Sequence, residues 1–101
     1  MKTKAEQRKA TPIFTGVLKY FPRALEEVSR ASLAGNKQHL DGQPLHWDRS
    51  KSKDQLDAAT RHLLDHAKGE IIDDDGVYHL GKVAWRVLAQ LEIILEDKNK
   101  K

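Results

Sequence analysis

The chain has 101 residues, no cysteine and a formal net charge of +3. This length favours a single domain, and the lack of cysteine excludes disulfides, thiolate zinc sites and cysteine nucleophiles. No apolar run is long enough to cross a bilayer and no signal-peptide pattern opens the chain, so we expect a soluble, cytoplasmic protein. One helical domain of this size has a modest core, so we expect subunit association to complete it.

Basic residues gather at the two ends of the chain. We predict a disordered basic tail at residues 1–11, a single helical domain at 12–97 and a second basic tail at 98–101. A nucleic-acid-binding surface needs a basic stripe with interleaved aromatics on an ordered element, and the central part of the sequence lacks one. Nucleic acid is therefore not an expected partner.

Three segments have the apolar spacing of amphipathic helices, and none alternates like a strand. We predict the first helix at residues 22–34, ending at a Gly35-Asn36 cap. The second follows a cap at Ser52 and runs to about residue 68. The third spans about 78–97 and has the widest apolar stripe: Leu80, Val83, Ala84, Val87, Leu88, Leu91, Ile94 and Leu95. The sequence thus predicts an all-α fold, a small bundle of about three main helices.

Two tryptophans lie outside these stripes. Trp47 stands in the loop between the first two helices, and we expect it to plug into the core. Trp85 points away from the main stripe of the third helix, which suggests a second packing surface for a subunit partner.

Carboxylates flank the apolar stripes of two different helices. Glu27 and Asp57 could converge from facing helices on Mg²⁺ or Mn²⁺, because these hard cations prefer oxygen ligands. Alternatively, Asp57 pairs with Arg61 on its own helix, and Glu27 pairs with a nearby Lys or Arg. Both readings stay open at the level of sequence.

The run Asp73-Asp74-Asp75-Gly76 predicts an acidic turn before the third helix. Consecutive acids do not fit an EF-hand, which needs acids at alternate positions. Glu70 could belong to this turn or to a metal cluster. His62 and His79 lie beside apolar stripes, either as packing residues or as functional groups.

Several pieces of the sequence together resemble the phage dATP/dGTP diphosphohydrolase (N-terminal domain) family, which is related to the MazG-like all-α nucleoside-triphosphate pyrophosphatases. The resemblance covers about residues 22–96. The pieces, in chain order, are Ala24-Leu25-Glu26-Glu27-Val28, Gly35-x-Lys37, the tryptophan loop, Leu56-Asp57-Ala58-Ala59-x-Arg61-His62, Gly69-Glu70 and His79-Leu80-x-x-x-Ala84-Trp85.

The resemblance implies a dimeric or tetrameric helical bundle. It further implies cleavage of a purine deoxynucleoside triphosphate (dGTP or dATP) to the monophosphate and pyrophosphate, with Mg²⁺ or Mn²⁺, in the cytoplasm of a phage host. Carried over by position, the catalytic residues would be Glu27, Asp57 and His62, and the metal ligands Glu27, Asp57 and Glu70. The substrate-binding residues would be Lys37, Trp47, Arg61, His79 and Arg86.

A second hypothesis is a non-catalytic helical module. It would keep the fold but use the Trp85 side for a protein partner, or its basic tails for nucleic acid. The number of carboxylates that converge on one point distinguishes the two hypotheses, because a metal cluster needs several.

Overall fold

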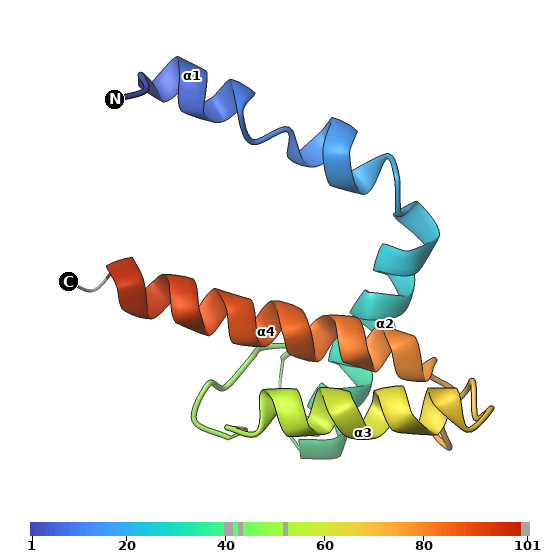
Figure 1. The fold of residues 1–101 in the computed structure, drawn as a ribbon. Coiled ribbons are helices and arrows are strands. Elements are labelled where there is room, and N and C mark those ends of the chain that lie inside the picture. The colour runs from blue at the N-terminus through green and yellow to red at the C-terminus, as the bar shows by residue number, and fades with distance from the viewer. Residues whose placement is uncertain (40–41, 43, 52, 100–101) are drawn as a thin grey trace.

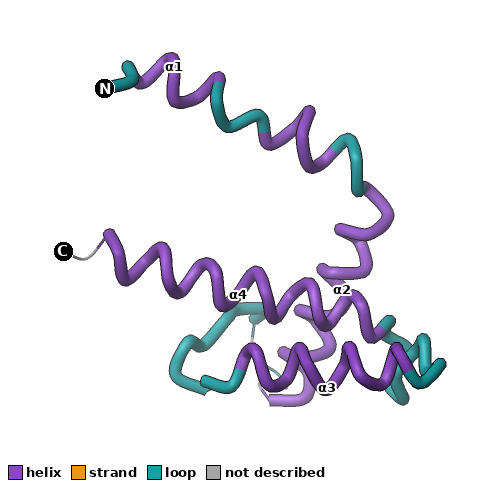
Figure 2. The backbone as a smooth tube through the Cα atoms, viewed as in Figure 1, coloured by secondary structure: helices purple, strands orange, loops and turns teal. Residues whose placement is uncertain are grey.

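The computed structural model describes residues 1–39, 42, 44–51 and 53–99. Its elements, in chain order, are α1 (Lys4–Lys9), a single π-helical turn η1 (Phe14–Leu18), α2 (Pro22–His39), α3 (Gln55–Ala67) and α4 (His79–Asn99) (Figures 1 and 2). Among the described residues there is no strand, only an isolated bridge between Ile72 and Tyr78. The prediction of an all-α fold is confirmed.

The bundle is built around α4. This helix packs along α3, which runs in the opposite direction, and it also crosses α2 (Figure 1). The buried apolar residues are small, so the helix backbones can come close together: Ala31, Ala58, Ala59, Val77 and Ala89. The two helices lie close together at Gly81 of α4, where an added Cβ would lie 3.0 Å from the backbone oxygen of Glu27 in α2.

The N-terminal part leads away from the bundle (Figure 1). The sequence predicts disorder for residues 1–11, whereas the structure has the short helix α1 there. A capping box explains this difference: the Glu6 N–H donates to the Thr3 hydroxyl, and the Thr3 N–H donates to the Glu6 carboxylate. No residue of α1 is buried, so its helical form rests on local hydrogen bonds alone.

Two predicted helix boundaries differ from the structure. The first predicted helix was expected to end at Gly35-Asn36, but α2 continues to His39. A glycine inside a helix costs only about 1 kcal/mol relative to alanine. The next residue, Asn36, is buried against the 44–51 loop, and its side-chain oxygen accepts a hydrogen bond of 3.4 Å from the His46 N–H. This contact helps to offset the cost of Gly35 within the helix. The expected cap at Ser52 lies outside the described residues, and α3 begins at Gln55.

The acidic turn reverses the chain between α3 and α4. Gly69 and Gly76 have positive φ angles of 96° and 83°, which favour glycine. The Asp73 N–H donates to the Val77 oxygen, and the Asp75 carboxylate accepts the N–H of Val77. The first residue of α4, His79, is thereby placed beside α3.

We predict that Gly81→Ala destabilises the fold by about 1–3 kcal/mol, because the new methyl group meets the α2 backbone rather than a flexible side chain. Gly35→Ala is the matched control. It has no atom within 4 Å of the added Cβ, so helix propensity should stabilise the protein by about 0.5–1 kcal/mol. Urea unfolding monitored by circular dichroism measures both. Equal stabilisation by the two substitutions would contradict the close contact at Gly81.

Candidate functional site

A cavity of about 130 Å³ lies where α2, the 44–51 loop, α3 and α4 meet. This volume is below the ~300–1,000 Å³ of sites that enclose a whole small molecule, so the cavity suits one part of a larger ligand. Its walls combine aromatic, cationic and acidic side chains. They are formed by Ala31, Ser32, Gly35, Asn36, His46, Trp47, Asp48, Lys51, Gln55, His62, Asp75, Lys82, Trp85 and Arg86.

The two tryptophans meet at this cavity. Their rings pack edge to face, with centroids 5.6 Å apart. The Arg49 guanidinium lies 4.0 Å from the centroid of the Trp47 ring and forms two hydrogen bonds, of 2.8 and 2.6 Å, with the Glu96 carboxylate on α4. These contacts fasten the loop to α4. Trp85, predicted to pack on a second surface, therefore packs on a loop of its own chain.

Cations line the cavity on the α4 side. Arg86 donates a hydrogen bond of 3.1 Å to the side-chain oxygen of Gln55, which is 1% exposed. This bond holds one edge of the guanidinium and leaves the rest of its donors for a ligand. With Lys51 and Lys82, the cavity has three cationic side chains against the carboxylates of Asp48 and Asp75. The arrangement can bind an anionic group such as phosphate.

Lys82 connects the acidic turn to α4. Its ammonium lies 2.7 Å from an oxygen of Asp73 and 2.6 Å from one of Asp75. The hydrogen bond from Lys82 holds the pKa of Asp73 below its ordinary value. Lys82 thus offsets part of the negative charge of the turn and fixes its position beside the cavity.

His62 of α3 and His79 of α4 face each other through their Nδ1 atoms, which are 2.9 Å apart. His79 is 2% exposed, and His62 also lines the cavity. Burial, followed by the charge of Lys82, lowers the pKa of His62, so its imidazole is neutral at pH 7. Asp65 lies next to this pair: one ligand atom from each of the three residues falls within 4.8 Å of the others.

The structure brings some of the sequence-predicted site residues together. Trp47, His62 and Arg86 line the cavity, and His79 stands directly behind His62. The side chain of Lys37, near the end of α2, lies outside the described part of the structure.

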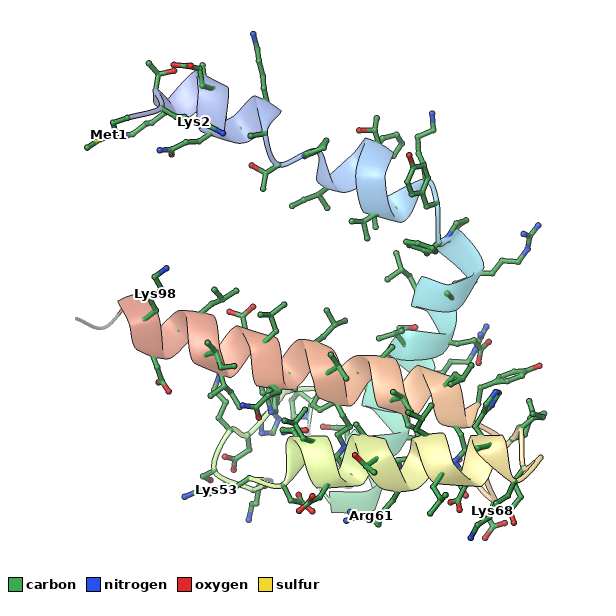
Figure 3. The ribbon with its side chains drawn as sticks, in the orientation of Figure 1. Met1, Lys2, Lys53, Arg61, Lys68 and Lys98 are labelled. Carbon is green, nitrogen blue, oxygen red and sulfur yellow. The ribbon has the colours of Figure 1, made fainter. Side chains whose placement is uncertain are left out.

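The other predicted site residues lie apart from the cavity walls. Glu27 forms an ion pair with Arg30, as in the alternative weighed from the sequence. Asp57 is exposed on α3, and Arg61 lies on the side of α3 away from α4 (Figure 3), where it pairs with Asp54 at 3.3 Å rather than with Asp57.

Glu70 is exposed just after α3. Within the described residues, Glu27, Asp57 and Glu70 do not form a group with metal-ligand spacing; the one such group is His62, Asp65 and His79.

Sequence reasoning missed Gln55, Asp65 and Lys82. The i, i+3 spacing of His62 and Asp65 places them on one helix face and could have indicated Asp65. No local pattern indicates Gln55 or Lys82, because their partners, Arg86 and the acidic turn, belong to other elements.

Comparison with known proteins agrees with the resemblance found in the sequence. A family model described as dATP/dGTP diphosphohydrolase, N-terminal, matches residues 1–101, and the chain belongs to this family. Comparisons with curated proteins and with solved structures give no match. Among the described residues, no helix has the length and apolar character needed to span a membrane.

We predict that Lys82→Gln destabilises the protein by about 1–3 kcal/mol, because Asp73 and Asp75 lose a charged donor and repel each other. Arg61→Gln is the control: its ion pair with Asp54 is exposed, so its loss should cost less than about 1 kcal/mol. Thermal unfolding at low and at high salt compares the two. If both substitutions have the same small effect, Lys82 does not hold the turn.

Proposed function

We propose that the chain is a metal-dependent diphosphohydrolase that cleaves dGTP or dATP to the monophosphate and pyrophosphate. Membership of the family supports the reaction class. The observation that carries the proposal is the cavity, because it joins cationic side chains to a pair of tryptophans. A nucleotide needs both features, since its phosphates are anionic and its base has a flat face that can stack.

The residues of the cavity would contact different parts of the nucleotide, according to their chemistry. Arg86 and Lys51 would bind phosphate oxygens, and Arg86 is oriented for this by Gln55. Trp47 and Trp85 would contact the base. Because the cavity is small, only part of the nucleotide would lie within it and the rest would extend along the surface.

Mg²⁺ or Mn²⁺ is part of the proposal. Such an ion would neutralise phosphate charge and activate water when bound. The sequence predicts that Glu27, Asp57 and Glu70 bind this ion. That assignment stays a prediction, because the three carboxylates do not lie close together in the single chain.

We predict that the protein releases pyrophosphate from dGTP or dATP when Mg²⁺ or Mn²⁺ is present. A panel of dNTPs with each metal, and with chelator as a control, measures this directly. Absence of pyrophosphate from every dNTP with both metals would contradict the proposal and favour the non-catalytic module.

We predict that Trp47→Ala weakens nucleotide binding, because base stacking on an aromatic side chain contributes about 1–3 kcal/mol, or roughly a 5- to 150-fold change in affinity. The chain has only two tryptophans, and both line the cavity, so quenching of their fluorescence reports binding there. Tyr20→Ala is the matched control, since Tyr20 is an exposed aromatic outside the cavity. Equal affinity of the Trp47→Ala variant and the unchanged protein would exclude Trp47 as a base contact.

The proposal includes a homodimer or homotetramer as the working state. The apolar residues of α4 remain between 45% and 53% exposed in the single chain: Val87, Leu88, Leu91, Ile94 and Leu95. An apolar groove of about 560 Å³ runs between α2 and α4 along the same face. Exposed apolar surface on this scale supports an interface with further copies. Such an enzyme would act on the nucleotide pool of the cytoplasm, that of the host for a phage protein.

We predict that Leu91→Glu shifts the protein towards the monomer, because it places a charge within this apolar face. Lys98→Gln, at the exposed end of α4, changes the charge by the same one unit outside the face and should leave the assembly intact. Sedimentation velocity at micromolar concentration distinguishes the two. A monomer already formed by the unchanged protein would contradict this part of the proposal.

A further inference from the structure

We propose that His62, Asp65 and His79 form a binding site for a divalent transition-metal ion such as Mn²⁺, Co²⁺ or Zn²⁺. The site differs from the three carboxylates predicted from sequence, and it lies at the wall of the cavity. It does not rest on the proposed function, because metal binding is measured without nucleotide.

The positions of the three side chains support the site. His62 and Asp65 lie one turn apart on the same face of α3, and the acidic turn places His79 against them. The two Nδ1 atoms are 2.9 Å apart, and ligand atoms from all three residues lie within 4.8 Å of one another. Two imidazole nitrogens bound to one tetrahedral metal ion, each at ~2.0–2.1 Å, would be about 3.3–3.4 Å apart. The two Nδ1 atoms, 2.9 Å apart, therefore need only a small movement to become neighbouring ligands on one ion.

The hydrogen-bond partners of the three side chains also support the site. The hydrogen bond between His62 and His79 accounts for the positions of the two rings, but it does not involve Asp65. Within the described residues, the half-buried Asp65 carboxylate forms no hydrogen bond or ion pair, although it stands beside two nitrogen atoms that can act as ligands. A metal ion would engage all three groups at once and would compensate for burying the carboxylate.

The chemistry of the ligand set selects the class of ion. Imidazole suits first-row transition metals, whereas Mg²⁺ and Ca²⁺ prefer oxygen ligands alone. Two histidines and one carboxylate leave coordination positions open for water or a ligand oxygen. An oxygen of Asp73 lies 4.0 Å from the Nδ1 of His62, so a second carboxylate borders the site. Because His62 also lines the cavity, a bound ion would lie beside an anionic ligand held there.

The test is a titration of the full chain, freed of metal by chelator, with Zn²⁺, Co²⁺ and Mn²⁺ in turn. Isothermal calorimetry gives the affinity and stoichiometry, and the visible absorption of Co²⁺ reports nitrogen ligands. We expect one ion per chain for at least one of the three metals. Changes at residues that only support a ligand already weaken metal binding ~10- to 100-fold, so His62→Gln and Asp65→Asn should each weaken it by at least about 10-fold.

His66→Gln is the matched control. His66 is a half-buried histidine on the same helix but lies outside the ligand group, so its replacement should leave metal affinity unchanged. Circular dichroism of each variant without metal confirms that it is folded. His79→Gln is left out of the primary set because His79 is almost fully buried, and its loss could unfold the protein.

Two results would overturn the proposal. One is no binding by the unchanged protein at millimolar concentrations of all three ions. The other is metal affinity that survives His62→Gln and Asp65→Asn but is lost in Asp57→Asn, which would place the ion at the carboxylates predicted from sequence. Pyrophosphate release is measured separately, so failure of the metal site can be distinguished from failure of the proposed function. A protein that binds metal through His62 but cleaves no dNTP would have the metal site and lack the proposed activity.

Discussion

The bundle depends on the close approach of α4 to its two neighbours. Small buried residues make this possible, and Gly81 lies directly against the backbone of Glu27. Because interiors are close-packed, one added methyl group at such a contact must move a helix. The walls of the cavity come from α2, α3, α4, the 44–51 loop and Asp75 of the acidic turn, so the positions of most groups in it follow from this packing.

Polar contacts between elements stabilise the fold in addition to the small apolar core. Lys82 fixes the acidic turn, Arg49 joins the tryptophan loop to α4 through Glu96, and Arg86 reaches the buried Gln55. The contacts of Arg49 and Arg86 join segments that are distant in sequence, whereas Lys82 joins the start of α4 to the turn just before it, and all three contacts end at or beside the cavity. The same interactions therefore stabilise the fold and orient the groups that a ligand would meet.

Much apolar surface remains exposed on α4, on α3 and in the N-terminal part. A short chain has a large surface for its volume, and this one buries mainly alanines. The apolar groove shares Ser32, Trp47 and Trp85 with the cavity, whereas the apolar residues further along α4 line only the groove. A subunit that covered the groove would therefore lie directly beside a ligand in the cavity.

The sequence by itself determined the helical class, the acidic turn and the family, because these depend on local periodicity, turn residues and motifs that are read along the chain. It also indicated Trp47, His62, His79 and Arg86, which the structure gathers at or beside one cavity. Only the tertiary structure decided which side chains meet: Asp65 rather than Asp57 stands with the histidines, Arg61 pairs with Asp54, and Trp85 packs on Trp47. The physical reason is that a helix period fixes which face a residue occupies, whereas the neighbour of that face depends on how separate helices pack.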